Sequence, residues 1–186
     1  MRFALFILIF ICFIHFQCKD EKNILSETEA AKWVNKEMLK EINLTYSDSG
    51  KIEIRILAPQ MIRYTEKNEL KEEFPIGFQA FFYGKNNELL NTLASKYAIR
   101  IRREGKTYMK DSVTFTTVDK EILKTSELIW DETNGRISTD KFVRIIRKNE
   151  LLQGYGFETD QNFKAGTVKS VDALIPSEKL YKEEGK

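Results

Sequence analysis

The side chains that most often carry out catalysis or bind metals are scarce in this chain. Its one histidine, His15, and its two cysteines, Cys12 and Cys18, all lie near the start of the sequence. Because no histidine follows residue 15, the rest of the chain lacks histidine general bases, Ser-His triads, Cys-His nucleophiles and histidine-built zinc sites. Phosphate-cradling glycine loops, CxxC pairs and calcium loops are also missing from the sequence. We therefore predict a protein without enzymatic activity, cofactor or metal.

Carboxylates are the remaining candidates for acid–base chemistry. A glycoside hydrolase would use two of the 28 Asp and Glu residues, roughly 5 to 9.5 Å apart. Asp131-Glu132, Glu158 and Asp160 flank predicted turns, however, and we interpret them as solvated turn residues. A carboxylate-dependent glycan hydrolase is thus a rival hypothesis without a located site. The 30 Lys and Arg residues leave a net charge of only +2, so no basic field favours a nucleic-acid partner.

An apolar run, Phe3 to Phe16, follows Met1-Arg2. It is shorter than the roughly 20 residues that span a membrane, and it suits the apolar core of a secretory signal. Cys18 comes next, followed by the charged tetrad Lys19–Lys22, an arrangement that resembles a bacterial lipoprotein signal. We expect residues 1–17 to be a signal peptide and Cys18 to carry a lipid anchor. An uncleaved apolar anchor, or cleavage elsewhere with Cys18 as an ordinary thiol, stays open.

Residues 18–41 are polar with a weak helical rhythm. Ser26 and Glu29 have the capping-box spacing, and Val34 and Met38 lie on one helical face. Because this apolar face is narrow, we predict an anchor and tether, with a short helix or none.

From Ile42 onward the apolar residues follow a period of two, which is typical of strands. Roughly ten or more short strands, separated by turn signals, indicate an antiparallel sheet folded on itself. We predict an all-β domain over residues 42–171, an elongated antiparallel twisted β-jelly roll or open groove of stacked hairpins. A charged, flexible tail is expected over residues 172–186.

The stretch Leu123–Phe163 predicts successive strands joined by tight turns. Asn134-Gly135 favours a two-residue type I′ turn, because both residues tolerate positive φ. A similar unit is written upstream: Gly105 stands 30 residues before Gly135, and Val113 stands 30 residues before Val143. We interpret this offset as a repeated β unit that stacks on its copy.

Three segments carry a resemblance to a known family, namely Leu123–Asp131, Gly135–Val143 and Gly154–Phe163, with looser agreement at Tyr46–Gly50 and Leu93–Tyr97. Together they resemble the LptC component of the lipopolysaccharide export machine. The resemblance implies a twisted β-jelly roll at the periplasmic face of the inner membrane. Such a protein receives lipopolysaccharide from the inner-membrane transporter subunits and passes it to a periplasmic β-jelly-roll bridge protein.

The N-terminus departs from this family. Well-known members have a transmembrane helix, whereas this chain offers the lipoprotein-like Cys18. The Lys-Asp-Glu run after that cysteine resembles a surface-export tag. The alternative is therefore a surface-exposed structural or binding lipoprotein with a closed β-sandwich.

The resemblance also implies that the apolar strand faces contact lipid, although a dry β core is the competing interpretation. A one-residue shift would invert the choice of face. By analogy with the family, the free edge of the terminal strand, Tyr155–Phe163, is expected to pair with the bridge protein. The first strands, Leu44–Ile56, are expected to face the transporter. The residues predicted to face inward are Phe78, Ala80, Phe82, Ile99, Ile101, Phe115, Leu128, Trp130, Val143, Ile145 and Phe157.

Overall fold

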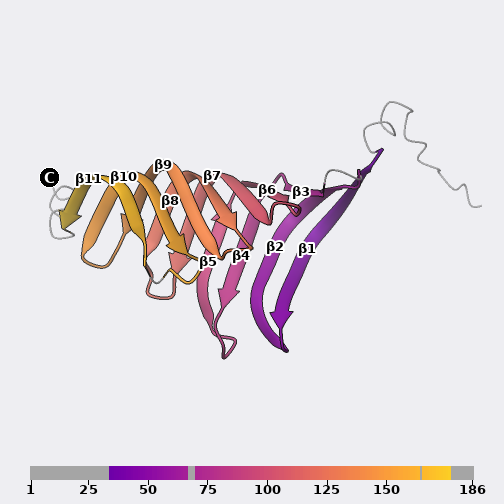
Figure 1. Ribbon diagram of the computed structural model, residues 1–186, viewed down its shortest axis with the longest axis horizontal. Helices are drawn as coiled ribbons and strands as arrows, with labels where there is room; N and C mark the ends of the chain where they lie inside the picture. Colours follow the sequence, from indigo (N-terminus) through magenta and orange to yellow (C-terminus); the bar gives the residue numbers. More distant parts are fainter. Residues whose placement is uncertain (1–33, 67–69, 164, 177–186) are drawn as a thin grey trace, which may run out of the picture. The chain divides into compact units, whose positions relative to one another are not determined.

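The computed structural model describes residues 34–66, 70–163 and 165–176 of the 186-residue chain. Within these ranges every regular element is a β-strand, and all strands lie in the compact unit Asn35–Lys186 (Figure 1). The expected signal peptide and Cys18 lie outside the described residues. The strands are β1 (Lys36–Asp48), β2 (Lys51–Tyr64), β3 (Lys71–Phe74), β4 (Phe78–Tyr83), β5 (Leu89–Ser95), β6 (Tyr97–Ile101), β7 (Lys106–Thr117), β8 (Ile122–Asp131), β9 (Arg136–Ile146), β10 (Glu150–Asp160) and β11 (Thr167–Pro176).

All eleven strands join one antiparallel sheet, in the order β11-β10-β9-β8-β7-β5-β4-β2-β3-β6, with β1 on β2 and an additional pairing of β6 with β7. Two routes of paired strands lead from β2 to β7. One route runs through β4 and β5, and the other runs through β3 and β6, so the strand pairing closes a ring. This single antiparallel sheet confirms the predicted all-β fold and is consistent with an elongated β-jelly roll.

The long strands bend in the middle, so that each contributes to two layers. Strand β2 pairs with β4 through Ile54–Leu57 and with β3 through Ile62–Arg63. Strand β7 changes partner from β6 to β5 in the same way, across Asp111 and Ser112, whose φ angles are 59° and 55°. Register shifts mark the corresponding bends of β8, β9 and β10.

We call these two layers the first and second walls. The first wall comprises β3, β6 and residues 36–40, 62–64, 106–110, 127–131, 136–139 and 157–160. The second wall comprises β4, β5 and residues 42–48, 51–57, 113–117, 122–125, 143–146 and 150–155. Strand β11 continues beside β10.

The 30-residue offset relates the hairpin β6–β7 to the hairpin β8–β9. Each hairpin has a four-residue turn that ends in a glycine, Gly105 with φ 62° and Gly135 with φ 61°. The buried residues Val113 and Val143 occupy the same place after the bends of β7 and β9. The repeat in the sequence is therefore a repeat of hairpin geometry.

The prediction of a two-residue type I′ turn at Asn134-Gly135 is wrong. Asp131 pairs with Arg136, which leaves four residues between the strands, and among them only Gly135 has positive φ. The backbone N–H of Asn134 donates a hydrogen bond to Asp131 Oδ1 at 2.9 Å. This Asx-type contact replaces the tighter turn.

The sheet extends beyond both expected domain boundaries. Strand β1 begins at Lys36, within the expected tether, because Leu39 packs against the core beside β2. Strand β11 reaches Pro176, past the expected start of the tail, and its Leu174 pairs with Leu152. Over the described ranges, no helix is long and apolar enough to cross a membrane.

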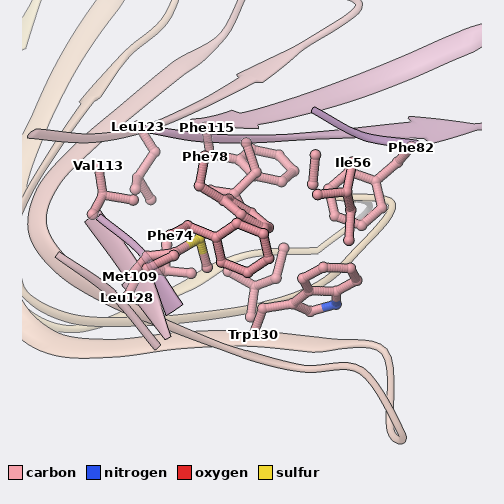
Figure 2. Packing of buried hydrophobic residues seen from close by; sticks show 14 of the residues in the cluster. Ile56, Phe74, Phe78, Phe82, Met109, Val113, Phe115, Leu123, Leu128 and Trp130 are labelled. Atoms are coloured by element: carbon pink, nitrogen blue, oxygen red, sulfur yellow. The ribbon is translucent and has the colours of Figure 1, made fainter. Parts of the chain in front are cut away.

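The two walls enclose a hydrophobic core. Figure 2 shows the rings of Phe74, Phe78, Phe82, Phe115 and Trp130 within it, and all five are almost completely buried. Burying a large apolar side chain contributes about 1.5–3 kcal/mol. The stability of the fold therefore depends strongly on contacts between inward-facing side chains.

Candidate functional site

Nine of the eleven residues predicted to face the interior are buried: Phe78, Ala80, Phe82, Phe115, Leu128, Trp130, Val143, Ile145 and Phe157. Their contact with lipid stays a prediction. For β6 the predicted face is wrong, because Ile99 and Ile101 are only half-buried while Ala98 lies in the core. Ala98 pairs with the core residues Phe74 and Met109. Strand alternation then places both isoleucines on the outer face.

Aromatic side chains of the two walls contact each other across the interior. Phe74 of the first wall lies edge to face with Phe78 of the second wall, with ring centroids 5.0 Å apart. Trp130 of the first wall makes the same kind of contact with Phe82 of the second wall at 5.1 Å. Such pairs are worth about 0.5–1.5 kcal/mol beyond the area they bury. These ring contacts hold the two walls together across the interior.

The segment Gln161–Phe163, which we call the closing loop, joins the walls on the side away from the bend. The ring of Phe163 stacks on Phe115 of the second wall at 4.8 Å and lies against Phe157 of the first wall at 5.5 Å. Asn91 Nδ2 of β5 donates a hydrogen bond to the Gln161 carbonyl at 3.0 Å. The sequence has no signal for this loop beyond the aromatic residue itself.

The apolar inner face continues beyond the core to β11. Leu174 of β11 pairs with Leu152 of β10, which packs against the core. Val171 of β11 pairs with Gly154 of β10, and Gly154 pairs on its other side with the buried Val143 of β9. Paired residues of antiparallel strands share a face, so both β11 residues point inward. They are nevertheless 59% and 56% exposed. The interior thus ends in an uncovered apolar surface at this edge.

Among the described strands, β1 and β11 form free edges of the sheet. The predicted edge Tyr155–Phe163 is wrong, because this segment includes β10, which lies between β9 and β11. Within Leu44–Ile56 the β1 part is a free edge, whereas residues 54–56 of β2 pair with β4 as well as β1. That this edge faces the transporter stays a prediction. Strand β1 is more polar than β2 beside it, whereas β11 is mostly exposed but no more polar than β10.

A family model described as "Lipopolysaccharide-assembly, LptC-related" matches residues 3–171. The chain belongs to the LptC family. None of the curated proteins compared with it matches. Membership confirms the resemblance seen in the sequence and supports a role in lipopolysaccharide transport. It does not favour the alternative of a surface lipoprotein.

In this LptC family member, the interpretation of Glu132 as a solvated turn residue is wrong, because its side chain is only 16% exposed. Its carboxylate accepts hydrogen bonds from Arg100 Nε at 2.9 Å, from Arg100 Nη2 at 2.6 Å and from Thr107 Oγ1 at 2.6 Å. Burial opposes the charge of Arg100, but the hydrogen bonds that Arg100 donates to Glu132 and the negative charge of Glu132 outweigh this effect and raise the pKa of Arg100. The β8–β9 turn holds Glu132 against strands β6 and β7, which the linear sequence does not show.

The other turn carboxylates have local partners. Asp131 accepts hydrogen bonds from the N–H of Asn134 at 2.9 Å and from its Nδ2 at 3.0 Å, and these bonds lower the pKa of Asp131. Asp160 accepts one from the N–H of Asn162 at 2.7 Å. These contacts agree with their interpretation as turn residues. Within the part of the chain that the structure describes, no cluster of three His, Cys, Asp or Glu side chains is placed to hold a metal ion.

Proposed function

We propose that this chain holds the acyl chains of lipopolysaccharide between its walls and passes the lipid along the sheet toward β11. The observation that carries the proposal is the apolar inner face that runs from the core to the exposed Val171 and Leu174. Each methylene exposed to water costs about 0.8 kcal/mol. A face that stays apolar up to the free edge avoids that cost at the point where the lipid leaves.

Lipid uptake requires the walls to part, because the interior is filled by side chains of the chain itself. The closing loop is held to the second wall by few contacts. Phe163 is only half-buried there, and among the described residues one hydrogen bond, from Asn91 to Gln161, joins the loop to β5. The opposite side is the continuous backbone of the bends, which stays paired. We infer that the walls open at the closing loop and remain joined at the bend.

The two free edges supply the partner surfaces. We propose that β1 faces the inner-membrane transporter subunits and that β11 pairs with a β-strand of the periplasmic bridge protein. An unpaired edge strand recognises another strand through its free backbone groups. The exposed inner-facing residues of β11 then become continuous with the interior of the partner. Strand β1 is the end that follows the N-terminal segment, so a membrane anchor there holds it near the inner membrane.

The anchor is proposed to be a lipid on Cys18, at the periplasmic face of the inner membrane. Support comes from the sequence alone, because a short apolar run and a cysteine precede a charged segment. Metabolic labelling with a palmitate analogue tests it. Wild-type chain should take up label, and Cys18→Ser should not. Labelling that survives Cys18→Ser would contradict lipidation at this cysteine.

Photo-crosslinking in living cells tests the transfer function. A photoreactive amino acid is placed at Phe82, Phe115 or Trp130, and lipopolysaccharide adducts are detected by blotting. Each position has a control one residue away that faces outward on the same strand: Phe81, Thr116 and Ile129. Adducts are expected at the inward positions, dependent on energised transport, and absent at the controls.

The same experiment can contradict the proposal in two ways. Absence of adducts at all inward positions would mean that the core stays dry. Equal adducts on both faces would mean that lipid contacts the outside of the sheet. In either case the role in lipid transfer between the walls is refuted.

A further inference from the structure

A ladder of charged side chains crosses the inner face of the first wall at its rim, the margin farthest from the bend. Neighbours in the ladder have opposite charge and come from successive elements: Glu37 of β1, Arg63 of β2, Glu72 of β3, Arg100 of β6 and Glu132 of the β8–β9 turn. Their sequence positions are far apart, and the sheet order brings them together.

The three ladder residues from β2, β3 and β6 point inward rather than to the outer surface. Each stands two positions from a fully buried core residue of its own strand, and strand alternation therefore gives it the same face. These core residues are Met61, Phe74 and Ala98. Arg100 Nη1 also donates a hydrogen bond to the hydroxyl of Tyr46 in the second wall. The ladder thus lies where the two walls meet.

The arginines of the rim are unequally neutralised. The carboxylate of Glu132 accepts hydrogen bonds of 2.6–3.0 Å from Arg100 and Thr107. Glu72, which is 4% exposed, is instead shared by three guanidinium groups, with N–O distances of 3.5 Å to Arg63, 3.4 Å to Arg100 and 4.0 Å to Arg102.

Two of these guanidinium groups keep donors available. The side chain of Arg63 is 37% exposed: its Nε is buried 3.5 Å from Glu72, and its Nη1 lies 3.6 Å from the exposed Glu37, beyond hydrogen-bond length. The side chain of Arg102 is 52% exposed, and its Nη1 lies 4.0 Å from Glu72 Oε1. A planar guanidinium with free donors binds phosphate oxygens well, often through two parallel hydrogen bonds.

We propose that Arg63 and Arg102 bind a phosphate group on the sugar headgroup of the transported lipid. This inference rests on the proposed function. The position suits such a ligand, because the rim adjoins the apolar interior: Glu132 lies two residues after the buried Trp130. The acyl chains can lie between the walls while the phosphate stays at the margin. Arg100 is a positioning residue, since its hydrogen bonds to Glu132 and Tyr46 fix its own side chain and the position of Glu72 beside the two arginines.

Binding of purified full-length chain in detergent tests the site. The probes are lipid A, the same lipid A after phosphatase treatment, and inorganic phosphate alone. The variant is Arg63→Gln/Arg102→Gln. The matched control, Arg55→Gln/Arg144→Gln, removes the same charge from the outer face of β2 and β9. Lost charge-assisted hydrogen bonds predict about 10- to 100-fold weaker binding of phosphorylated lipid A by the variant. Binding of dephosphorylated lipid A should change less than about threefold, and the control should bind both like wild type.

Each other outcome is decisive. Equal weakening for both lipids would show that the two arginines only support the fold, and equal weakening in the control would show nonspecific charge attraction. Inorganic phosphate bound as tightly as lipid A would assign the site to free phosphate. Wild-type protein that binds neither lipid would overturn the proposed function together with this inference. Binding of both lipids that is unchanged by Arg63→Gln/Arg102→Gln would overturn the inference alone.

Discussion

Replacing Phe163 by alanine should destabilise the protein and at the same time speed lipid uptake. A buried Phe→Ala change costs about 3–5 kcal/mol. Phe163 is only partly buried where it stacks on Phe115 and Phe157, so roughly 2 kcal/mol is expected. For a folded unit of this size, that loss lowers Tm by roughly 8 °C. If the lost contacts hold the walls closed, the open population rises by about 30-fold, because each 1.4 kcal/mol is a factor of ten.

Thermal unfolding followed by circular dichroism measures the first effect, and stopped-flow fluorescence of a labelled acylated lipid measures the second. Val118→Ala is a suitable control, because Val118 lines the groove beside Phe163 but is 62% exposed. It should change stability by less than about 0.5 kcal/mol and leave uptake unchanged. A Phe163→Ala protein that loses stability but takes up lipid at the wild-type rate would refute opening at the closing loop. Unchanged stability would refute the ring stacking itself.

Three further substitutions test the fold around the site. Gly154→Ala brings a Cβ into a clash with the Ser170 carbonyl oxygen of β11. We expect a loss of about 1–3 kcal/mol in stability and faster hydrogen exchange in β11, and unaltered exchange there would contradict the pairing. The pKa of Glu73 lies below its ordinary value of 4.5, because hydrogen bonds from Tyr64 and Tyr97 outweigh the effect of burial. The Glu73 carboxylate therefore stabilises the folded protein above pH 4.5, and this stabilisation is lost as the pH falls through its lowered pKa. Glu73→Gln should reduce the fall in unfolding free energy at acidic pH, measured by denaturant titrations at several pH values. An unchanged fall would contradict this. Glu132→Ala leaves Arg100 without its main partner. The side chains of Glu132 and Arg100 are only 16% and 14% exposed, so we expect a loss of about 1–3 kcal/mol in stability. A double-mutant cycle of Glu132 and Arg100 that shows no coupling would refute this.

Much of the fold follows from the sequence because a sheet with one buried face imposes a period of two on its residues. The turn glycines and the 30-residue offset located the hairpins β6–β7 and β8–β9. The pattern fails for β6, a five-residue strand whose two isoleucines lie on the outer face while the small Ala98 faces the core. Apolar character alone could not choose the face there, because a short strand gives too few alternations to fix its phase.

The edge strands and the rim are harder to predict for different reasons. Strands β1 and β11 each pair with a neighbour on one side only. Charged residues separate the apolar ones in β1, so that it resembles a tether, and β11 is a mostly exposed strand whose end resembles a tail. Edge strands in natural sheets commonly carry such charges. The contacts of Glu72 with Arg63 and Arg100 join residues from three strands. Pairing of β3 with β2 and with β6 brings these residues together, and no local sequence pattern predicts those contacts.

The filled interior also bears on what drives transport. When an acyl chain replaces the contact between Phe82 and Trp130, apolar contacts are exchanged for apolar contacts, so the net free energy per methylene is far smaller than the roughly 0.8 kcal/mol of transfer from water. A lipid held this way can leave as readily as it arrives. The walls therefore supply shielding without direction along the sheet. In the proposed function, direction has to come from the transporter that we place at β1. Orientation comes from polar contacts at the rim, where we propose that Arg63 and Arg102 hold a phosphate outside the apolar layer.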